Sequence, residues 1–189
     1  MIAGILGKLG RGKTCLLTAL AYFNYKFGSL YVKSLLYPRL FNLSNSHEIY
    51  ANYHLKFPYK PVTCYDELDD MKSGSAFLDE FWVWADSRMS MTNKNKSVSM
   101  LALKSRKRDL DIYYSAQNWS RIDKRIRNIT DILIMPDYDM RTGIISVDVC
   151  EPLEKYKEVI KSFKISAKPF FSMYDTTQEI GELDNDEDD

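Results

Sequence analysis

The chain of 189 residues is long enough for one domain with a buried core and too short for two domains of ordinary size. Hydrophobic residues make up 45% and charged residues 28%, a balance that excludes an intrinsically disordered protein. The balance of 26 basic and 26 acidic residues hides an asymmetry, because residues 179–189 hold seven carboxylates and no basic residue. We therefore expect one domain over residues 1–178, whose charge is about +7, and an acidic disordered tail over 179–189.

The first elements are expected to be a strand, a glycine loop and a helix. The run Ile2–Leu6 is apolar and stops at a glycine cluster, which is typical of a buried parallel strand. Apolar residues then recur at helical spacing over 14–27, and Gly28 stands where a helix would end.

Strands and helices are then expected to alternate. Residues 48–55 alternate between apolar and polar side chains as in a strand. Further strands are expected over 75–78, 110–115 and 132–135, and helices over 65–72, 97–108 and 121–128. This order predicts an α/β fold with a mainly parallel sheet and helices on both faces. A turn at 140–143 predicts that residues 132–149 form an antiparallel hairpin at one edge.

Residues 7–14 match the pattern G-x-x-x-x-G-K-[ST] of a phosphate-binding loop, in its usual place between a strand and a helix. The glycines let backbone N–H groups surround phosphates, Lys13 can reach the β and γ phosphates, and the Thr14 hydroxyl can bind Mg²⁺. We expect ATP to be bound by Gly7, Gly10, Arg11, Gly12, Lys13, Thr14 and Cys15.

Two later strand ends carry polar side chains. Asp79 and Glu80 follow the apolar run 75–78, where an aspartate can hold Mg²⁺ with Thr14 and a glutamate can activate water. Gln117 follows the strand 110–115, where its amide can contact the γ-phosphate or the attacking water. Together these residues predict a Mg²⁺-dependent ATPase with Lys13, Glu80 and Gln117 as catalytic residues.

The remaining signals concern partners and compartment. Residues 94–127 hold ten Lys or Arg and only three Asp, which fits either a polyanionic partner or a solvated basic face. Cys15, Cys64 and Cys150 show no metal-site or redox spacing, which is typical of a reducing compartment. The sequence contains no apolar run of the roughly 18 residues that span a bilayer. We therefore expect a cytoplasmic protein without a membrane span.

These motifs resemble those of the FtsK/HerA-like ATPases, and among them the small genome-packaging ATPases of archaeal and other membrane-containing viruses. The resemblance extends from residue 1 to about residue 178. Besides the motifs above, it rests on residues 82–84, Arg88, residues 105–108, and 122–127. Residues 50–53 and 174–176 also resemble the filamentous-phage assembly proteins of the zonula occludens toxin family, which usually carry a membrane segment.

The resemblance implies a RecA-like fold and a homo-oligomeric ring, a pentamer or hexamer, with ATP between neighbours. An arginine of one subunit would reach the γ-phosphate bound by the next, and Arg88, Arg106 and Arg108 are the candidates. It also implies a double-stranded DNA substrate held without base readout, a capsid or portal-like vertex as a further partner, and residence in the host cytoplasm or the virion.

Three functions remain open at this point: a DNA-translocating motor, a small-molecule or nucleotide kinase, and an assembly or secretion ATPase of the zonula occludens toxin type. A kinase has no need of Glu80 beside Asp79 to activate water. A GTPase would need the guanine-reading motif N-K-x-D, but Lys96 stands where the aspartate belongs. The motor uses Glu80, Gln117 and the basic segment together, so it is the function we expect.

Overall fold

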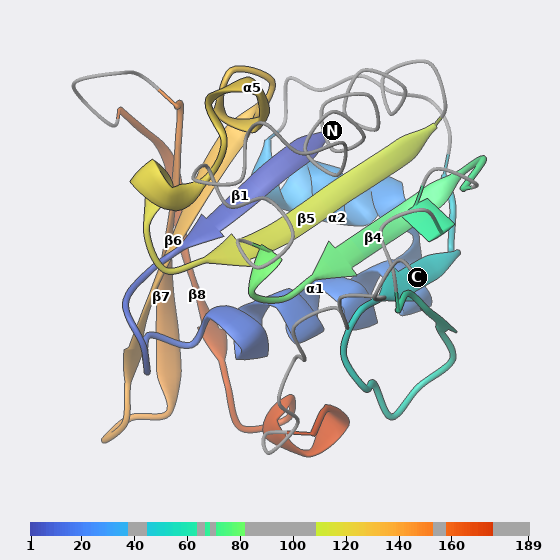
Figure 1. The fold of residues 1–189 in the computed structure, drawn as a ribbon. Coiled ribbons are helices and arrows are strands. Elements are labelled where there is room, and N and C mark those ends of the chain that lie inside the picture. Colours follow the sequence, from blue (N-terminus) through green and yellow to red (C-terminus); the bar gives the residue numbers. More distant parts are fainter. Residues whose placement is uncertain (38–44, 64–66, 69–70, 82–108, 153–157, 176–189) are drawn as a thin grey trace, which may run out of the picture.

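The computed structural model describes residues 1–37, 45–63, 67–68, 71–81, 109–152 and 158–175. In this part of the chain eight strands form one sheet in the order β3-β2-β4-β5-β1-β6-β7-β8 (Figure 1). The strands are β1 Ile2–Leu6, β2 Ile49–Ala51, β3 Lys60–Pro61, β4 Gly74–Leu78, β5 Leu110–Ala116, β6 Ile132–Asp139, β7 Ile144–Cys150 and β8 Val159–Ser166. The helices are α1 Lys13–Phe27, α2 Ser29–Leu36 and α5 Lys124–Arg127, with short 3-10 turns at Trp119–Arg121 and Phe171–Met173.

The sheet is mainly parallel, with an antiparallel edge. Strands β1 to β6 pair in parallel, whereas β6 with β7 and β7 with β8 are antiparallel. The predicted α/β class and the hairpin over 132–149 are therefore confirmed. Strand β5 lies between β1 and β4, so the strand that precedes the glycine loop and the strand that precedes Asp79 are not direct neighbours.

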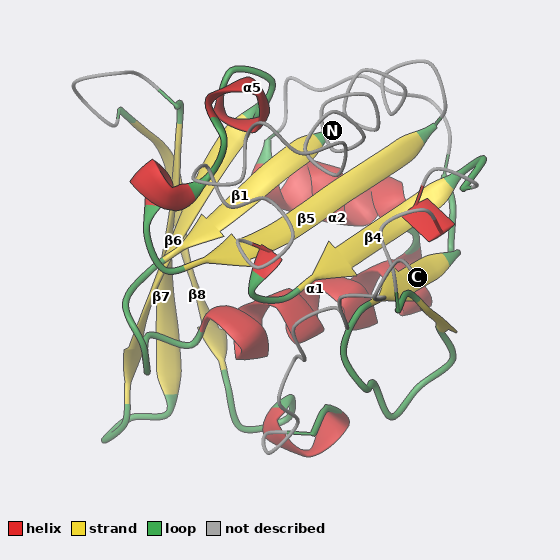
Figure 2. Ribbon diagram, viewed as in Figure 1, coloured by secondary structure: helices red, strands yellow, loops and turns green. Residues whose placement is uncertain are grey.

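Both faces of the sheet are buried, and helices lie on both (Figure 2). Helices α1 and α2 cover one face, where Ala3 and Ile5 of β1 point. Ile2 and Leu6 point to the opposite face, where Ile126 of α5 joins the core. The prediction that helices cover both faces is thus confirmed, and the period-two alternation along β1 explains why the whole strand is apolar.

Several predicted elements differ from those observed. The strand expected over 48–55 is short, because pairing ends at Ala51 and the chain bends from Asn52 onward. The helix expected over 121–128 is a 3-10 turn followed by the single turn of α5. Helix α2 and strand β8 were not predicted. The expected helix over 97–108 lies outside the described residues, as does half of that over 65–72.

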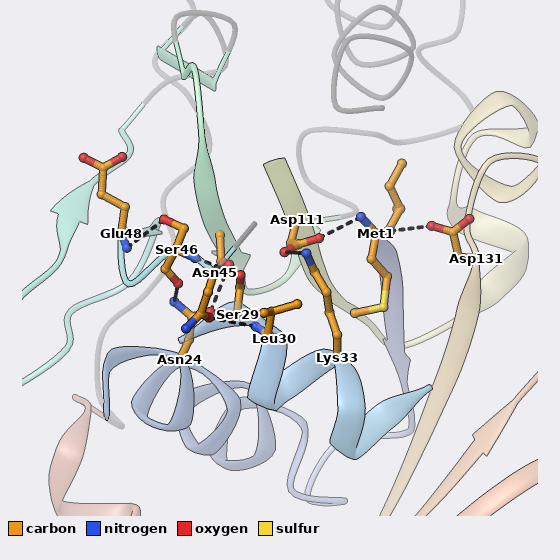
Figure 3. A network of polar contacts seen from close by, with 12 residues as sticks. Met1, Asn24, Ser29, Leu30, Lys33, Asn45, Ser46, Glu48, Asp111 and Asp131 are labelled. Carbon is orange, nitrogen blue, oxygen red and sulfur yellow. Dashed lines mark hydrogen bonds and ion pairs between the residues drawn. The ribbon is translucent and has the colours of Figure 1, made fainter. Parts of the chain in front are cut away.

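A buried polar network ties the amino ends of the central strands to α2 (Figure 3). Asp111 of β5 accepts a hydrogen bond of 2.7 Å from the Met1 amino group and forms an ion pair of 2.8 Å with Lys33 of α2. The side chains of Asp111 and Lys33 are only 2% and 4% exposed. Asp131 accepts a hydrogen bond from the Ile2 N–H at 2.7 Å. This network lies at the end of the sheet opposite the glycine loop.

Candidate functional site

The glycine loop joins the carboxyl end of β1 to the first turn of α1. Gly12 has φ of 82°, and a Cβ built there would lie 3.1 Å from the Cβ of Tyr138, so backbone and space both require glycine. Lys13 is the first residue of α1 and is 5% exposed, and its ammonium donates to the carbonyl of Lys8 at 3.3 Å. The loop, the helix N-terminus and this lysine form a site suited to phosphate groups.

Thr14 and Asp79 lie in direct contact although they come from separate elements. The Thr14 hydroxyl donates to Oδ2 of Asp79 at 2.7 Å, and the Ser115 hydroxyl donates to Oδ1. Asp79 follows β4, and its side chain is almost fully buried, which raises its pKa although both hydroxyls oppose the shift. A hydroxyl and a carboxylate in contact form a suitable pair of protein ligands for Mg²⁺, which keeps most of its waters and takes few protein ligands.

Glu80 has an unusual backbone. Its φ is 46°, and among the described residues it is the one non-glycine residue with positive φ. Such strain persists only where neighbouring groups impose it, and it often marks functional sites. The Glu80 N–H donates to Oγ of Ser115 at 2.9 Å. Glu80 is half-buried, beside the residue that contacts Thr14.

The side-chain amide of Asn52 forms two hydrogen bonds with the main chain of Asp79. The Asp79 N–H donates to Oδ1 of Asn52 at 2.7 Å, and Nδ2 of Asn52 donates to the Asp79 carbonyl at 2.8 Å. Asn52 comes directly after β2, the strand that pairs with β4. We did not predict a site role for Asn52 or Ser115. Both are polar residues at the carboxyl end of a strand, and Asn52 also lies within residues 50–53, which resemble the zonula occludens toxin family.

Gln117 is exposed and directly follows β5, which places it beside the glycine loop. It lines a pocket of about 580 Å³ together with Gly7, Lys8, Arg11 and Trp119. The lining does not include Lys13, Thr14 or Asp79, so the pocket adjoins the predicted phosphate site without containing it. The contact of Gln117 with a γ-phosphate stays a prediction.

Two predicted nucleotide-binding residues have side chains engaged elsewhere. Arg11 forms an ion pair with Asp137 of β6, and both side chains are more than half exposed. The Cys15 thiol is buried against the Ala167 carbonyl, and burial raises its pKa to about 12. The Cys15 side chain therefore belongs to the core, which leaves its backbone N–H for a ligand.

The predicted arginine fingers Arg88, Arg106 and Arg108 lie outside the described residues, as does the part of the basic segment before residue 109. Within the described part of that segment, Arg125 is paired with Asp123, whose carboxylate accepts from Nη2 at 2.8 Å and from Nε at 3.0 Å. No helix in the described ranges has both the length and the apolar character needed to cross a bilayer.

The sheet order, the glycine loop before α1 and the Thr14–Asp79 contact define the fold of a P-loop NTPase of the RecA-like type. No family model and no curated protein sequence matches the chain.

Solved structures of this fold are similar to the chain. One is the N-terminal domain of zonular occludens toxin from Neisseria meningitidis, with 15% identity, a TM-score of 0.54, and coverage of 92% of this chain and 98% of that one. A second is the genome packaging NTPase B204 from Sulfolobus turreted icosahedral virus 2 in complex with ATP-gammaS, with 9% identity, a TM-score of 0.53, and coverage of 85% and 96%. A third is the DNA-packaging ATPase B204 from Sulfolobus turreted icosahedral virus, with 10% identity, a TM-score of 0.52, and coverage of 85% and 96%.

The structural neighbours confirm the predicted resemblance at the level of the fold. Both groups of proteins named from the sequence, the viral packaging ATPases and the zonula occludens toxin family, are represented among them.

Proposed function

We propose that the chain is an ATP-hydrolysing motor that moves double-stranded DNA through a homo-oligomeric ring, and that its task is packaging of a viral genome. The observation that carries this proposal is the contact of 2.7 Å between Thr14 and Asp79, with Glu80 next in the chain. This contact joins a P-loop hydroxyl to a buried carboxylate, and the next residue along the chain supplies a second carboxylate. Similar structures include packaging NTPases, one of them with ATP-gammaS bound.

In this proposal each residue of the site has a separate role in ATP hydrolysis. Lys13 and the loop N–H groups bind the phosphates of ATP, and Thr14 and Asp79 hold Mg²⁺, which when bound neutralises charge on the phosphates. Glu80 accepts a proton from the attacking water, and Gln117 orients that water or the γ-phosphate. A kinase would exclude water from this point, so the Asp79–Glu80 pair favours hydrolysis.

The ring and the DNA substrate rest on the packaging NTPases among the similar structures and on the basic segment 94–127. Phosphate contacts from that segment would hold DNA without reading its sequence. A capsid or portal-like vertex would be the further partner, and the protein would act in the host cytoplasm or remain with the virion.

An assembly or secretion ATPase is the second candidate. It is favoured by the toxin-family domain, which covers 92% of this chain, more than the 85% covered by the packaging NTPases. The two functions make different demands on DNA. A motor should hydrolyse ATP faster with double-stranded DNA, whereas an assembly ATPase should be indifferent to it.

The deciding experiment measures ATP turnover with and without double-stranded DNA, together with the mass of the assembly. We expect turnover per subunit to rise as rings form and to rise further with DNA. Turnover that is unaffected by DNA would overturn the motor in favour of the assembly ATPase. A monomer with a rate independent of concentration would overturn the ring.

Mixed rings would identify the arginine finger. An Ala variant of Arg88, Arg106 or Arg108 that lacks the finger should be inactive alone yet still bind ATP. Mixed with Lys13→Ala subunits, which keep the finger, it should regain turnover at the mixed interfaces. Normal basal hydrolysis by all three variants would place the finger elsewhere, with Arg121 and Arg125 next to test.

A further inference from the structure

We propose that Asn52 and Ser115 are positioning residues that hold Asp79 and Glu80 in a left-handed turn, and so set the direction of the Glu80 side chain during hydrolysis. The inference rests on the proposed ATPase function and adds two residues that do not touch substrate. It starts from the φ of 46° at Glu80.

A left-handed backbone is unfavourable for glutamate. Its Cβ approaches the following carbonyl oxygen, which disfavours this conformation by roughly a factor of ten. A turn at the end of β4 would therefore relax to negative φ unless other groups hold it. Relaxation would rotate the Cα–Cβ bond of Glu80 away from its present direction. The glycine loop between β1 and α1, and Lys13 at the start of α1, would stay in place.

Two side chains from two neighbouring strands hold this turn on both sides. Asn52, after β2, satisfies both the N–H and the carbonyl of Asp79, at 2.7 and 2.8 Å. Ser115 of β5 accepts from the N–H of Glu80 at 2.9 Å, and its own hydroxyl donates to the Asp79 carboxylate. Ser115 is fully buried, so water does not readily replace it.

Three main-chain groups are held by these side chains: the N–H and the carbonyl of Asp79 and the N–H of Glu80. They belong to the two peptide groups on either side of the Asp79 Cα, so both peptide groups are fixed. Because β2 and β5 flank β4 in the sheet, the turn is fixed relative to the strands on both sides of it. Asn52 touches only the main chain of Asp79 among the bonds described, whereas Ser115 also touches the carboxylate that contacts Thr14. Asn52 is therefore the cleaner residue to change.

The first measurement is steady-state hydrolysis by the full chain carrying Asn52→Ala. We expect kcat to fall about tenfold, the penalty for left-handed glutamate, while KM for ATP changes by less than about twofold. Ser115→Ala should also lower kcat, and Ser115→Thr, which keeps the hydroxyl, should restore it. Wild-type kcat in Asn52→Ala would overturn the proposal.

The matched control is Asn24→Ala, in helix α1 well away from Glu80 in the chain. Asn24 is buried, whereas Asn52 is half-buried, and like Asn52 it uses its side-chain amide in two hydrogen bonds, to the Ser46 carbonyl at 3.3 Å and from the Ser75 hydroxyl at 3.1 Å. We expect it to lower thermal stability and leave kcat of the folded protein unchanged. An equal loss of kcat in both asparagine variants would mean that general loosening, not positioning of Glu80, lowers the rate.

A double variant tests whether Asn52 acts through Glu80. In a Glu80→Gln background, whose low turnover is measured in single-turnover reactions, Asn52→Ala should cost almost nothing further. A full additional tenfold loss would show that Asn52 contributes independently of Glu80 and would overturn the proposal.

Amide hydrogen exchange tests the hold without activity. The N–H groups of Asp79 and Glu80 should be protected in the wild type, Asn52→Ala should expose the first, and Ser115→Ala should expose the second. If the wild type does not hydrolyse ATP, the proposed function is wrong, but hydrogen exchange still tests whether Asn52 and Ser115 hold the turn at Asp79 and Glu80. Unchanged protection in both variants would overturn this positioning role.

Discussion

Removal of the Asp111 carboxylate should strongly destabilise the fold without touching the nucleotide site. Asp111 is 2% exposed and balances the Lys33 ammonium at 2.8 Å and the Met1 amino group at 2.7 Å. Asp111→Ala leaves Lys33 buried and unpaired, which typically costs about 3–5 kcal/mol of the free energy of unfolding. For a chain of this size that corresponds to a fall of roughly 6–20 °C in Tm.

The assay is urea unfolding followed by circular dichroism, with Glu48→Ala as the control. Glu48 forms an ion pair with Lys60, and the side chains of the two residues are 40% and 57% exposed, respectively. Removal of the Glu48 carboxylate should therefore lower the free energy of unfolding far less. ATP binding by the folded fraction of Asp111→Ala should match that of the wild type. Equal losses of stability in the two variants would show that burial does not make the Asp111 network important for the fold.

Three further outcomes are expected. Lys13→Ala should lose ATP binding, whereas Glu80→Gln should still bind ATP and lose turnover by a factor on the order of a hundred or more; equal loss of binding in both would show that Glu80 has another role. Burial raises the folded-state pKa of Asp79 above its unfolded value, so its contribution to stability is present at low pH and is lost as pH rises through the folded pKa. Asp79→Asn should therefore make the ligand-free protein more stable than the wild type in urea at pH 7, with a gap that closes below about pH 4; a gap independent of pH would contradict this. We hypothesise that the acidic tail competes with DNA for the basic segment, so deletion of residues 182–189 should leave ATP turnover intact and tighten DNA binding at low salt, measured by fluorescence anisotropy. Unchanged affinity after the deletion would leave the tail with a role in solubility alone.

The sequence predicts the centre of this fold well, because local patterns and burial agree there. Strand β1 and helix α1 begin and end within a residue of the predicted limits, and the apolar run 75–78 is β4 apart from its first residue. The sharp change from apolar run to glycine cluster to helical spacing is a purely local signal. The local pattern is therefore sufficient to predict β1 and α1.

Prediction fails where tertiary contacts override local pattern. The alternation over 48–55 continues past Ala51, but Asn52 leaves the strand to bond the main chain of Asp79. Strand β8 alternates only weakly, because all of its residues are half-buried or exposed.

The candidate site likewise has residues that local motifs predict and residues whose role depends on tertiary contacts. Lys13, Thr14, Asp79 and Glu80 belong to motifs that can be read in sequence, and the contact between Thr14 and Asp79 agrees with that interpretation. The left-handed Glu80 and its hold by Asn52 and Ser115 depend on three strands meeting, which no local pattern reports.

The central place of β1 has a consequence for how the chain acquires its shape during synthesis. Ile2 pairs with Ile112 and Ala3 with Ile132, so β1 leaves the ribosome long before either of the strands that pair with it. Until then, both edges of an apolar strand remain open, which is a state prone to mispairing. Thr14 and Asp79 likewise meet only once β5 has been inserted between their strands. Nascent chains truncated before residue 110 should therefore be unable to bind nucleotide, although they already contain the entire glycine loop.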